Sequence, residues 1–164
     1  MLLELRIKLQ SPILAAQNTR DGIRKFIRDS VNDIALSTDL WHYAFQQAAA
    51  DLHMDKLDMD TIRLPAAFRA PKIDLFNRKY RIGDKGTLRE AKHECINSGA
   101  ELTVTIALAS QSAPGTSDNL RPPTLDEFKR MLDLAGARYG FSPWGSGKTY
   151  GRFRVLHLKQ VTHL

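Results

Sequence analysis

Several stretches of the chain alternate between apolar and polar residues, which is the pattern of a strand with one buried face. The clearest cover residues 2–9 and 101–108, and a third covers residues 152–158. Shorter strands are predicted over residues 61–64 and within residues 73–82, where β-forming residues are mixed with cations. In the last of these strands, the alternation predicts that one face carries Phe153, Val155 and His157.

Three other segments place apolar residues at helical spacing. Residues 20–36 predict a first helix, and residues 37–54 predict a second that begins at a Ser-Thr-Asp cap. The third helix opens at Thr124, which forms a capping box with Glu127, and its predicted C-cap is Gly136.

The order of these elements is strand, helices, two or three strands, helix, strand. This order predicts an α+β, ferredoxin-like βαββαβ fold with an extra helix, an antiparallel sheet with helices on one face, and a C-terminal glycine-rich loop. A chain of 164 residues is expected to form a single domain, residues 1–164. The second face of the sheet is then covered by loops or a partner, or is used for binding.

The charge of the chain is unevenly placed. The net charge is +6, and residues 61–92 alone carry nine Lys or Arg and three Asp or Glu, whereas residues 1–60 are mildly acidic. Clustered cations favour a polyanionic ligand, because they release counterions from phosphates. The alternative is a solvated basic loop region.

Other features narrow the class of protein. The chain has one cysteine, Cys95, which excludes an internal disulfide and a cysteine-rich zinc module. Its apolar runs are too short to span a bilayer, and charged residues interrupt the N-terminal leucines where a signal peptide needs an apolar core. These features predict a cytoplasmic protein with no membrane partner.

The segment from residue 136 to residue 155 combines glycines, aromatic residues and cations. Residues 145–149, Gly-Ser-Gly-Lys-Thr, end like a P-loop, but Ser142 stands where the first glycine is required, and a helix precedes the loop. The combination is instead typical of single-strand nucleic-acid binding, in which cations contact phosphates and aromatic rings stack on bases. Tyr139 and Phe141 are included among these rings. The alternative is a glycine-rich hairpin whose aromatic side chains pack on the sheet.

The predicted nucleic-acid-binding residues fall in two patches. The C-terminal patch comprises Arg138, Trp144, Lys148, Tyr150, Arg152 and Arg154. The second patch comprises Arg78, Lys79 and Arg81. Arg152 and Arg154 are predicted to project from one face of the last strand, because Phe153 separates them.

No catalytic, metal-binding or cofactor-binding residue is predicted. The five histidines show no metal-ligand spacing, and the acidic residues between 51 and 60 do not match a calcium loop. His93 precedes Cys95 by two residues, and Cys95 is expected to be a small buried residue.

The C-terminal third resembles two groups of proteins. A helix ending in Ala-Gly, a glycine-rich loop, then Gly-x-Phe and a strand is similar to the RAMP proteins of CRISPR systems, which implies a ferredoxin-like RNA-binding fold. Residues 11–14, Ser-Pro-Ile-Leu, together with residues 134–140 and 150–155, resemble a group of uncharacterised bacteriophage proteins, which implies a viral origin. Residues 141–142, Phe-Ser, depart from the group, where a glycine-containing turn is usual.

The sequence therefore predicts a non-catalytic protein of phage origin that binds single-stranded RNA or DNA. No helix-turn-helix or zinc-finger pattern offers a recognition helix for duplex DNA. The alternative is a phage structural or host-factor-inhibiting interaction module, whose basic patches bind an acidic protein partner. Self-association is compatible with both.

Overall fold

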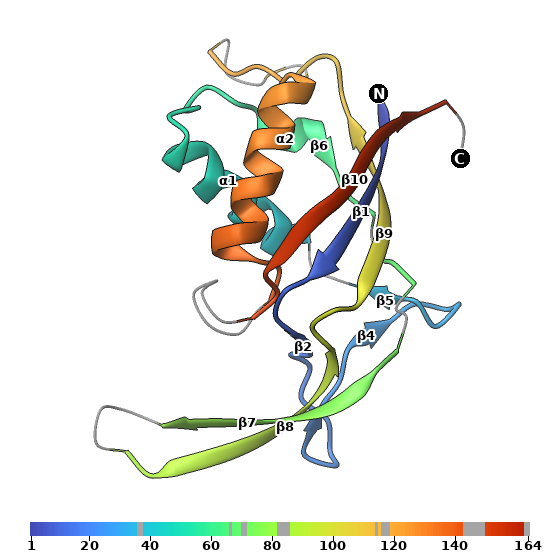
Figure 1. Cartoon of the computed structure of the whole chain (residues 1–164), viewed down its shortest axis with the longest axis vertical. Helices are drawn as coiled ribbons and strands as arrows, with labels where there is room; N and C mark the ends of the chain where they lie inside the picture. Colours follow the sequence, from blue (N-terminus) through green and yellow to red (C-terminus); the bar gives the residue numbers. More distant parts are fainter. Residues whose placement is uncertain are drawn as a thin grey trace.

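The computed structural model describes residues 1–35, 38–65, 67–69, 72–81, 86–113, 115, 119–142 and 150–162. Its main sheet has the strand order β10-β1-β9-β6, and every neighbouring pair is antiparallel. The strands are β1 (Leu2–Leu9), β6 (Ile62–Arg63), β9 (Glu101–Leu108) and β10 (Phe153–Val161). Helices α1 (Thr38–Asp51) and α2 (Leu125–Leu134) cover one face of this sheet (Figure 1).

Two crossovers interleave in this sheet. The first runs from β1 through α1 to β6, with β9 between the two strands, and the second runs from β9 through α2 to β10, with β1 between them. This is the ferredoxin-like βαββαβ arrangement, so the predicted fold class is confirmed.

The core lies between the sheet and the two helices. Side chains on β1 alternate as predicted, so that Leu3, Leu5 and Ile7 are fully buried. Phe45 of α1 meets Phe128 of α2 edge to face, with ring centroids 5.6 Å apart. Among the described residues, neither helix has the length and apolar character that a bilayer span requires.

The helix predicted over residues 20–36 is wrong. This segment instead forms three two-residue strands, β3 (Ile23–Arg24), β4 (Ile27–Arg28) and β5 (Ile34–Ala35). Ile27 is 57% exposed and Val31 is 73% exposed, so the apolar spacing does not produce a buried stripe. The β-branched side chains favour extended backbone, and a positive φ at Gly22 and at Asn32 would break a helix.

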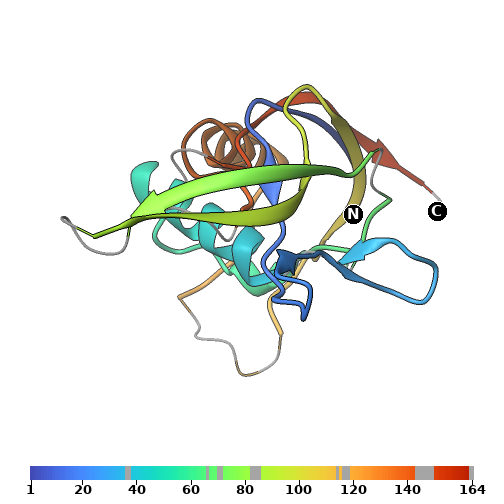
Figure 2. The same ribbon diagram turned by 90° about the horizontal axis from the view of Figure 1, so that it is seen from below.

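A second sheet forms outside the βαββαβ core. Its order is β2-β8-β3, with β7 paired to β8, and its longer strands are β7 (Asp74–Arg81) and β8 (Leu88–Ile96); β2 covers only Ile13–Leu14. The β7–β8 hairpin lies between β6 and β9 in sequence and projects at the bottom of Figure 1. Seen from below in Figure 2, it runs across that end of the molecule.

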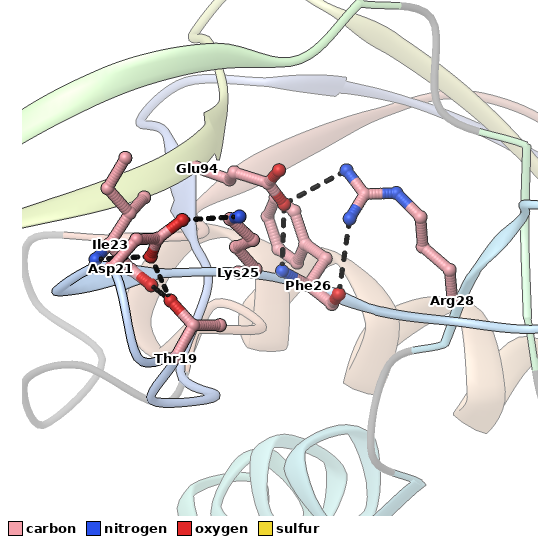
Figure 3. A network of polar contacts seen from close by, with 7 residues as sticks. All are labelled: Thr19, Asp21, Ile23, Lys25, Phe26, Arg28 and Glu94. Carbon is pink, nitrogen blue, oxygen red and sulfur yellow. Dashed lines mark hydrogen bonds and ion pairs between the residues drawn. The ribbon is translucent and has the colours of Figure 1, made fainter.

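A network of polar contacts fastens the β3–β4 segment to the hairpin (Figure 3). Glu94 of β8 accepts a hydrogen bond from the backbone N–H of Phe26 at 2.9 Å and forms an ion pair with Arg28, also at 2.9 Å. Asp21 binds Lys25 at 2.7 Å and accepts from the N–H of Ile23 at 3.0 Å. The hydrogen bond from the Lys25 ammonium has the largest effect on the pKa of Asp21. It lowers this pKa, so the carboxylate stays ionised.

The helical segment that begins with α2 continues further than predicted. The capping box of Thr124 and Glu127 is present at its start, as expected. At its end a π-helical turn, η2 (Ala135–Tyr139), continues the chain, and Gly140 with φ of 68° terminates it. Gly136 is not the C-cap; a Cβ there would lie 2.5 Å from the carbonyl oxygen of Phe153.

The strand β10 also departs from the predicted alternation. A bulge shifts the register, because Arg6 pairs with His157 whereas Ile7 pairs with Val155. The extra residue is Leu156, and His157 is exposed rather than sharing the buried face of Phe153.

Candidate nucleic-acid interface

The β7–β8 hairpin separates its side chains onto two faces. One face is formed by three pairs of residues that lie directly opposite each other on the two strands, and we call it the inner face. The pairs are Phe76 with His93, Arg78 with Ala91, and Tyr80 with Arg89. The opposite, outer face carries Leu75, Asn77, Lys79 and Arg81 of β7, all exposed. Along β7, the inner residues are half-buried.

The inner face joins cations to aromatic rings. The guanidinium carbon of Arg78 lies 4.9 Å from the ring centroid of Tyr80, a cation–π contact. Arg89 pairs with Tyr80 across the hairpin, and Arg24 of β3 pairs with His93, which extends the row of cations. Asp74, at the start of β7, lies in line with this face and forms an ion pair with Lys72 at 3.1 Å.

His93 is the buried residue of the inner face, opposite Phe76. The ring is fully buried, and its Nδ1 lies 2.7 Å from the carbonyl oxygen of Ala15. Burial lowers the pKa of His93, and the positive charges of Arg24 and Arg78 lower it further, against the effect of the bond to Ala15. The ring is therefore neutral at pH 7, and it supports the surrounding arginines without adding a charge.

Cys95 lies two residues further along β8. It is buried, as expected from the sequence, and burial raises the pKa of its thiol. Within the part of the chain that the structure describes, no group of three or more His, Cys, Asp or Glu is placed to hold a metal ion.

The glycine-rich loop is closed at its base by backbone contact. The N–H of Phe141 donates to the carbonyl oxygen of Gly151 at 3.0 Å, and the N–H of Gly151 donates to that of Pro12 at 2.8 Å. Gly151 has φ of 72°, and a Cβ there would lie 2.7 Å from the nitrogen of Ser142. Only glycine fits this position, which directly follows Tyr150.

Tyr150 connects the two predicted patches. Its ring meets that of Phe76 edge to face, with centroids 6.0 Å apart and planes at 79°. Tyr150 of the glycine-rich segment thus lies on the inner face of the hairpin, beside the row that contains Arg78. Two segments separated by about 70 residues in sequence therefore form one surface.

The three cations of the second patch do not share a surface. Arg78 is on the inner face with the aromatic rings, whereas Lys79 and Arg81 are on the outer face. Lys79 also lies 3.4 Å from Glu90, directly opposite on β8.

The remaining residues of the C-terminal patch are dispersed. Arg138 forms an ion pair with Asp51 at the end of α1, at 3.0 Å. Arg152 precedes β10 and is half-buried, and its backbone N–H donates to Ser11 Oγ at 2.9 Å. Arg154 is exposed and pairs with Lys8 on the main sheet, on the face away from the helices. Trp144 and Lys148 lie outside the described residues.

Two aromatic residues of the C-terminal segment are structural. Phe141 is fully buried and stacks on Phe153, with centroids 4.4 Å apart. The hydroxyl of Tyr139 donates to Asp51 at 2.5 Å, and this bond lowers the pKa of Asp51. Phe141 is therefore not the exposed stacking ring that the sequence suggested, because it fills the space between α1 and β10.

Comparison with known proteins supports the fold. No protein-family model and no curated protein matches the chain. Among solved structures, a chain in the cryo-EM structure of the type III-B Cmr-beta bound to cognate target RNA matches with a TM-score of 0.59 at 11% sequence identity.

This match covers 96% of the present chain but only 59% of its neighbour, so the chain spans less than two thirds of that protein. At this identity the likeness concerns the fold. It agrees with the ferredoxin-like assignment and with the distant resemblance to CRISPR RAMP proteins, and it gives no support to a phage origin.

Three inner-face residues were missed by the sequence patterns. They are Phe76, Tyr80 and Arg89. The alternation of Phe76, Arg78 and Tyr80 with polar residues was a usable signal for β7. The position of Arg89 depends on the pairing of β8, a strand that the sequence patterns did not predict.

Proposed function

We propose that this chain binds single-stranded nucleic acid, RNA in preference to DNA, on the inner face of the β7–β8 hairpin and without catalysis. The contact between Tyr150 and Phe76 carries the proposal, because it brings the glycine-rich segment onto the face that holds Arg78 and Tyr80. Arginines bind phosphates while exposed ring faces accept bases.

The geometry of the rings supports a single strand rather than a duplex. Phe76 and Tyr80 lie four residues apart on one face of β7, which corresponds to about 13 Å along the strand, and Arg78 lies between them. Stacking needs bases with accessible faces, which a duplex does not offer except at its ends.

The structural neighbour also supports RNA as the ligand. The matched chain comes from a structure described as the type III-B Cmr-beta bound to cognate target RNA, and the present chain shares its fold over 96% of the present length. A phage origin, and the host-cell cytoplasm as the location, rest on the sequence resemblance and composition alone.

The test is a fluorescence polarisation titration with single- and double-stranded oligonucleotides at two salt concentrations. Tyr80→Ala is expected to weaken single-strand binding about tenfold, the effect of one lost stacking contact. Arg78→Ala is expected to weaken binding and to flatten its salt dependence, because one phosphate contact is lost.

The matched control is Arg81→Ala, which removes the same charge from the outer face. We expect it to bind nearly as well as the unmodified chain. If Arg81→Ala and Arg78→Ala weaken binding equally, the ligand responds to net charge and the inner face is not the site. Intact oligonucleotide after incubation with and without Mg²⁺ is expected; cleavage would contradict the absence of catalysis.

A protein-interaction module is the second candidate, and one observation favours it. The outer face of the hairpin exposes two leucines, Leu75 and Leu88, at 63% and 52%, close to cations that suit an acidic partner. Purified protein that carries no nucleic acid, is not retained on heparin and forms a homogeneous oligomer would favour this candidate. Copurifying nucleic acid would favour the first.

A further inference from the structure

A pocket of about 390 Å³ opens beside the C-terminal end of α1. Its wall is partly apolar, through Met54, Met59 and Leu120, and it carries three carboxylates, those of Asp55, Asp58 and Asp60. The three aspartates precede or belong to η1 (Met59–Thr61), a short 3₁₀ helix before β6. In Figure 1, β6 and the loop before it lie in the upper half, away from the hairpin at the bottom.

Asp58 is the unusual member of the pocket. It is only 4% exposed, and its Oδ1 accepts a hydrogen bond from the N–H of Asp60 at 3.1 Å. Its Oδ2 is buried and has no hydrogen-bond partner among the described residues. A polar oxygen removed from water without a hydrogen-bond partner is costly, so this atom favours a donor supplied from outside the chain.

The surroundings add negative potential. The pocket is lined by Ala49 and Ala50 in the last turn of α1, where the helix dipole favours a cation, and that turn contains no basic residue. None of the three aspartates forms an ion pair within the described part of the chain.

Two cations lie beside this pocket without lining it. Lys56 and Arg121 line a neighbouring pocket that shares Met54, Asp55 and Leu57 with the first. The guanidinium of Arg121 is bound to both carboxylate oxygens of Glu127, at 2.6 and 2.7 Å.

We propose that this pocket binds the side chain of an arginine or lysine presented by a protein partner. The aliphatic stem of such a side chain packs on the methionines and the leucine, while its charged end donates to Asp58 Oδ2. An apolar wall beside carboxylates suits a cation on an alkyl stem better than a hydrated metal ion, which prefers oxygen ligands on all sides. This site is separate from the proposed nucleic-acid interface.

The test is NMR titration of the isotope-labelled chain with N-acetyl-arginine amide. N-acetyl-citrulline amide is the matched probe, because it has nearly the same shape without the charge. We expect the amide signals of residues 54–60 to shift with the arginine probe and not with the citrulline probe. We expect Asp58→Asn to weaken this binding at least tenfold, with unchanged affinity for an oligonucleotide.

Two further variants keep the test interpretable. Asp55→Asn, at an exposed position of the pocket, is expected to weaken binding severalfold even if Asp58→Asn fails to fold. Asp126→Asn removes the same charge from an exposed position of α2 that does not line the pocket, and it should bind as the unmodified chain does.

Three outcomes would overturn the proposal. They are equal shifts with both probes, a response of the same carboxylates to Mg²⁺ but not to the arginine probe, and tighter binding of spermidine, which would assign the pocket to free polyamines. Concentration-dependent self-association that is lost in Asp58→Asn would support it and identify the partner as a second copy.

Discussion

The main sheet and the β7–β8 hairpin are both antiparallel, but they use alternation differently. On β1 and β9, every second side chain is buried against the helices. On β7, every second side chain is only half-buried, and these are Asp74, two aromatic rings and an arginine. Packing alone accounts for the first pattern. The second leaves two aromatic side chains and an arginine only half-buried, so they add less to the stability of the fold and remain available to a ligand.

The largest difference is expected from removing one ring on each side of this comparison. Phe153→Ala empties a position in contact with Phe141 and should lower the free energy of unfolding by about 3–5 kcal/mol. Tyr80→Ala should change it by less than about 1 kcal/mol, because half of that site is open. Urea unfolding followed by circular dichroism measures both. Equal losses would mean that the hairpin is part of the folded core rather than an appendage.

A smaller effect is expected where the two regions meet. Gly151→Ala forces a left-handed φ on alanine and a Cβ against backbone, so we expect a loss of about 1–3 kcal/mol and weaker oligonucleotide binding through Tyr150. Gly99→Ala is the control, because Gly99 has φ of 85° but a Cβ added there would meet nothing within 4 Å. If both variants lose the same stability, φ alone explains the glycine and the close contact adds nothing.

The next smaller effect is expected in mild acid, which should destabilise the hairpin strand β8 before helix α2 of the core. The pKa of His93 is lowered in the folded state, so its contribution to stability is complete above the unfolded pKa of about 6.5 and is lost as pH falls below it. The slope cannot exceed about 1.4 kcal/mol per pH unit for one group. We expect the protection factors of β8 amides against hydrogen exchange to fall below pH 6.5 before those of α2 amides. His93→Gln should remove the difference, and its persistence would assign it to another group.

The smallest effect concerns the start of α2. Arg121, then the Thr124 backbone, lowers the pKa of Glu127 from 4.5 to about 2. This stabilisation is complete above pH 4.5 and is lost as pH falls toward 2. Glu127→Gln keeps the capping hydrogen bond but not the charge, so it should cost at most about 1 kcal/mol at pH 7. The melting temperatures of variant and unmodified chain should converge near pH 2; a constant gap would contradict the ion pair.

Sequence patterns predicted the main sheet well because its strands face one core. Leu3, Leu5 and Ile7 must all point inward, and only one strand geometry allows this. The apolar residues of 20–36 also fit a helix, but β-branched side chains and contacts to β8 through Glu94 hold the segment extended. Local spacing could not reveal that competition.

The candidate site was predicted in part, for a related reason. Tyr150 and Arg78 were chosen from composition, and the structure places both at the inner face. Phe141 was chosen by the same reasoning but is buried. Composition could not separate the two cases, because an aromatic residue in this segment is equally compatible with the core and with the surface. Which of the cations share a face depends on strand register, which composition does not contain.

The pairing of β1 with β10 also has a kinetic consequence. Leu2 lies opposite Val161, so the pairing of β1 with the edge strand β10 joins segments separated by nearly the whole chain. Contacts at such separation form slowly, because the entropy of closing the intervening loop is lost before they stabilise the fold. During synthesis, the β7–β8 hairpin can close locally while β1 still lacks a neighbour. The hairpin's own part of the surface proposed for nucleic acid can therefore form early, whereas the contact between Phe76 and Tyr150 that completes this surface has to wait for the C-terminal segment.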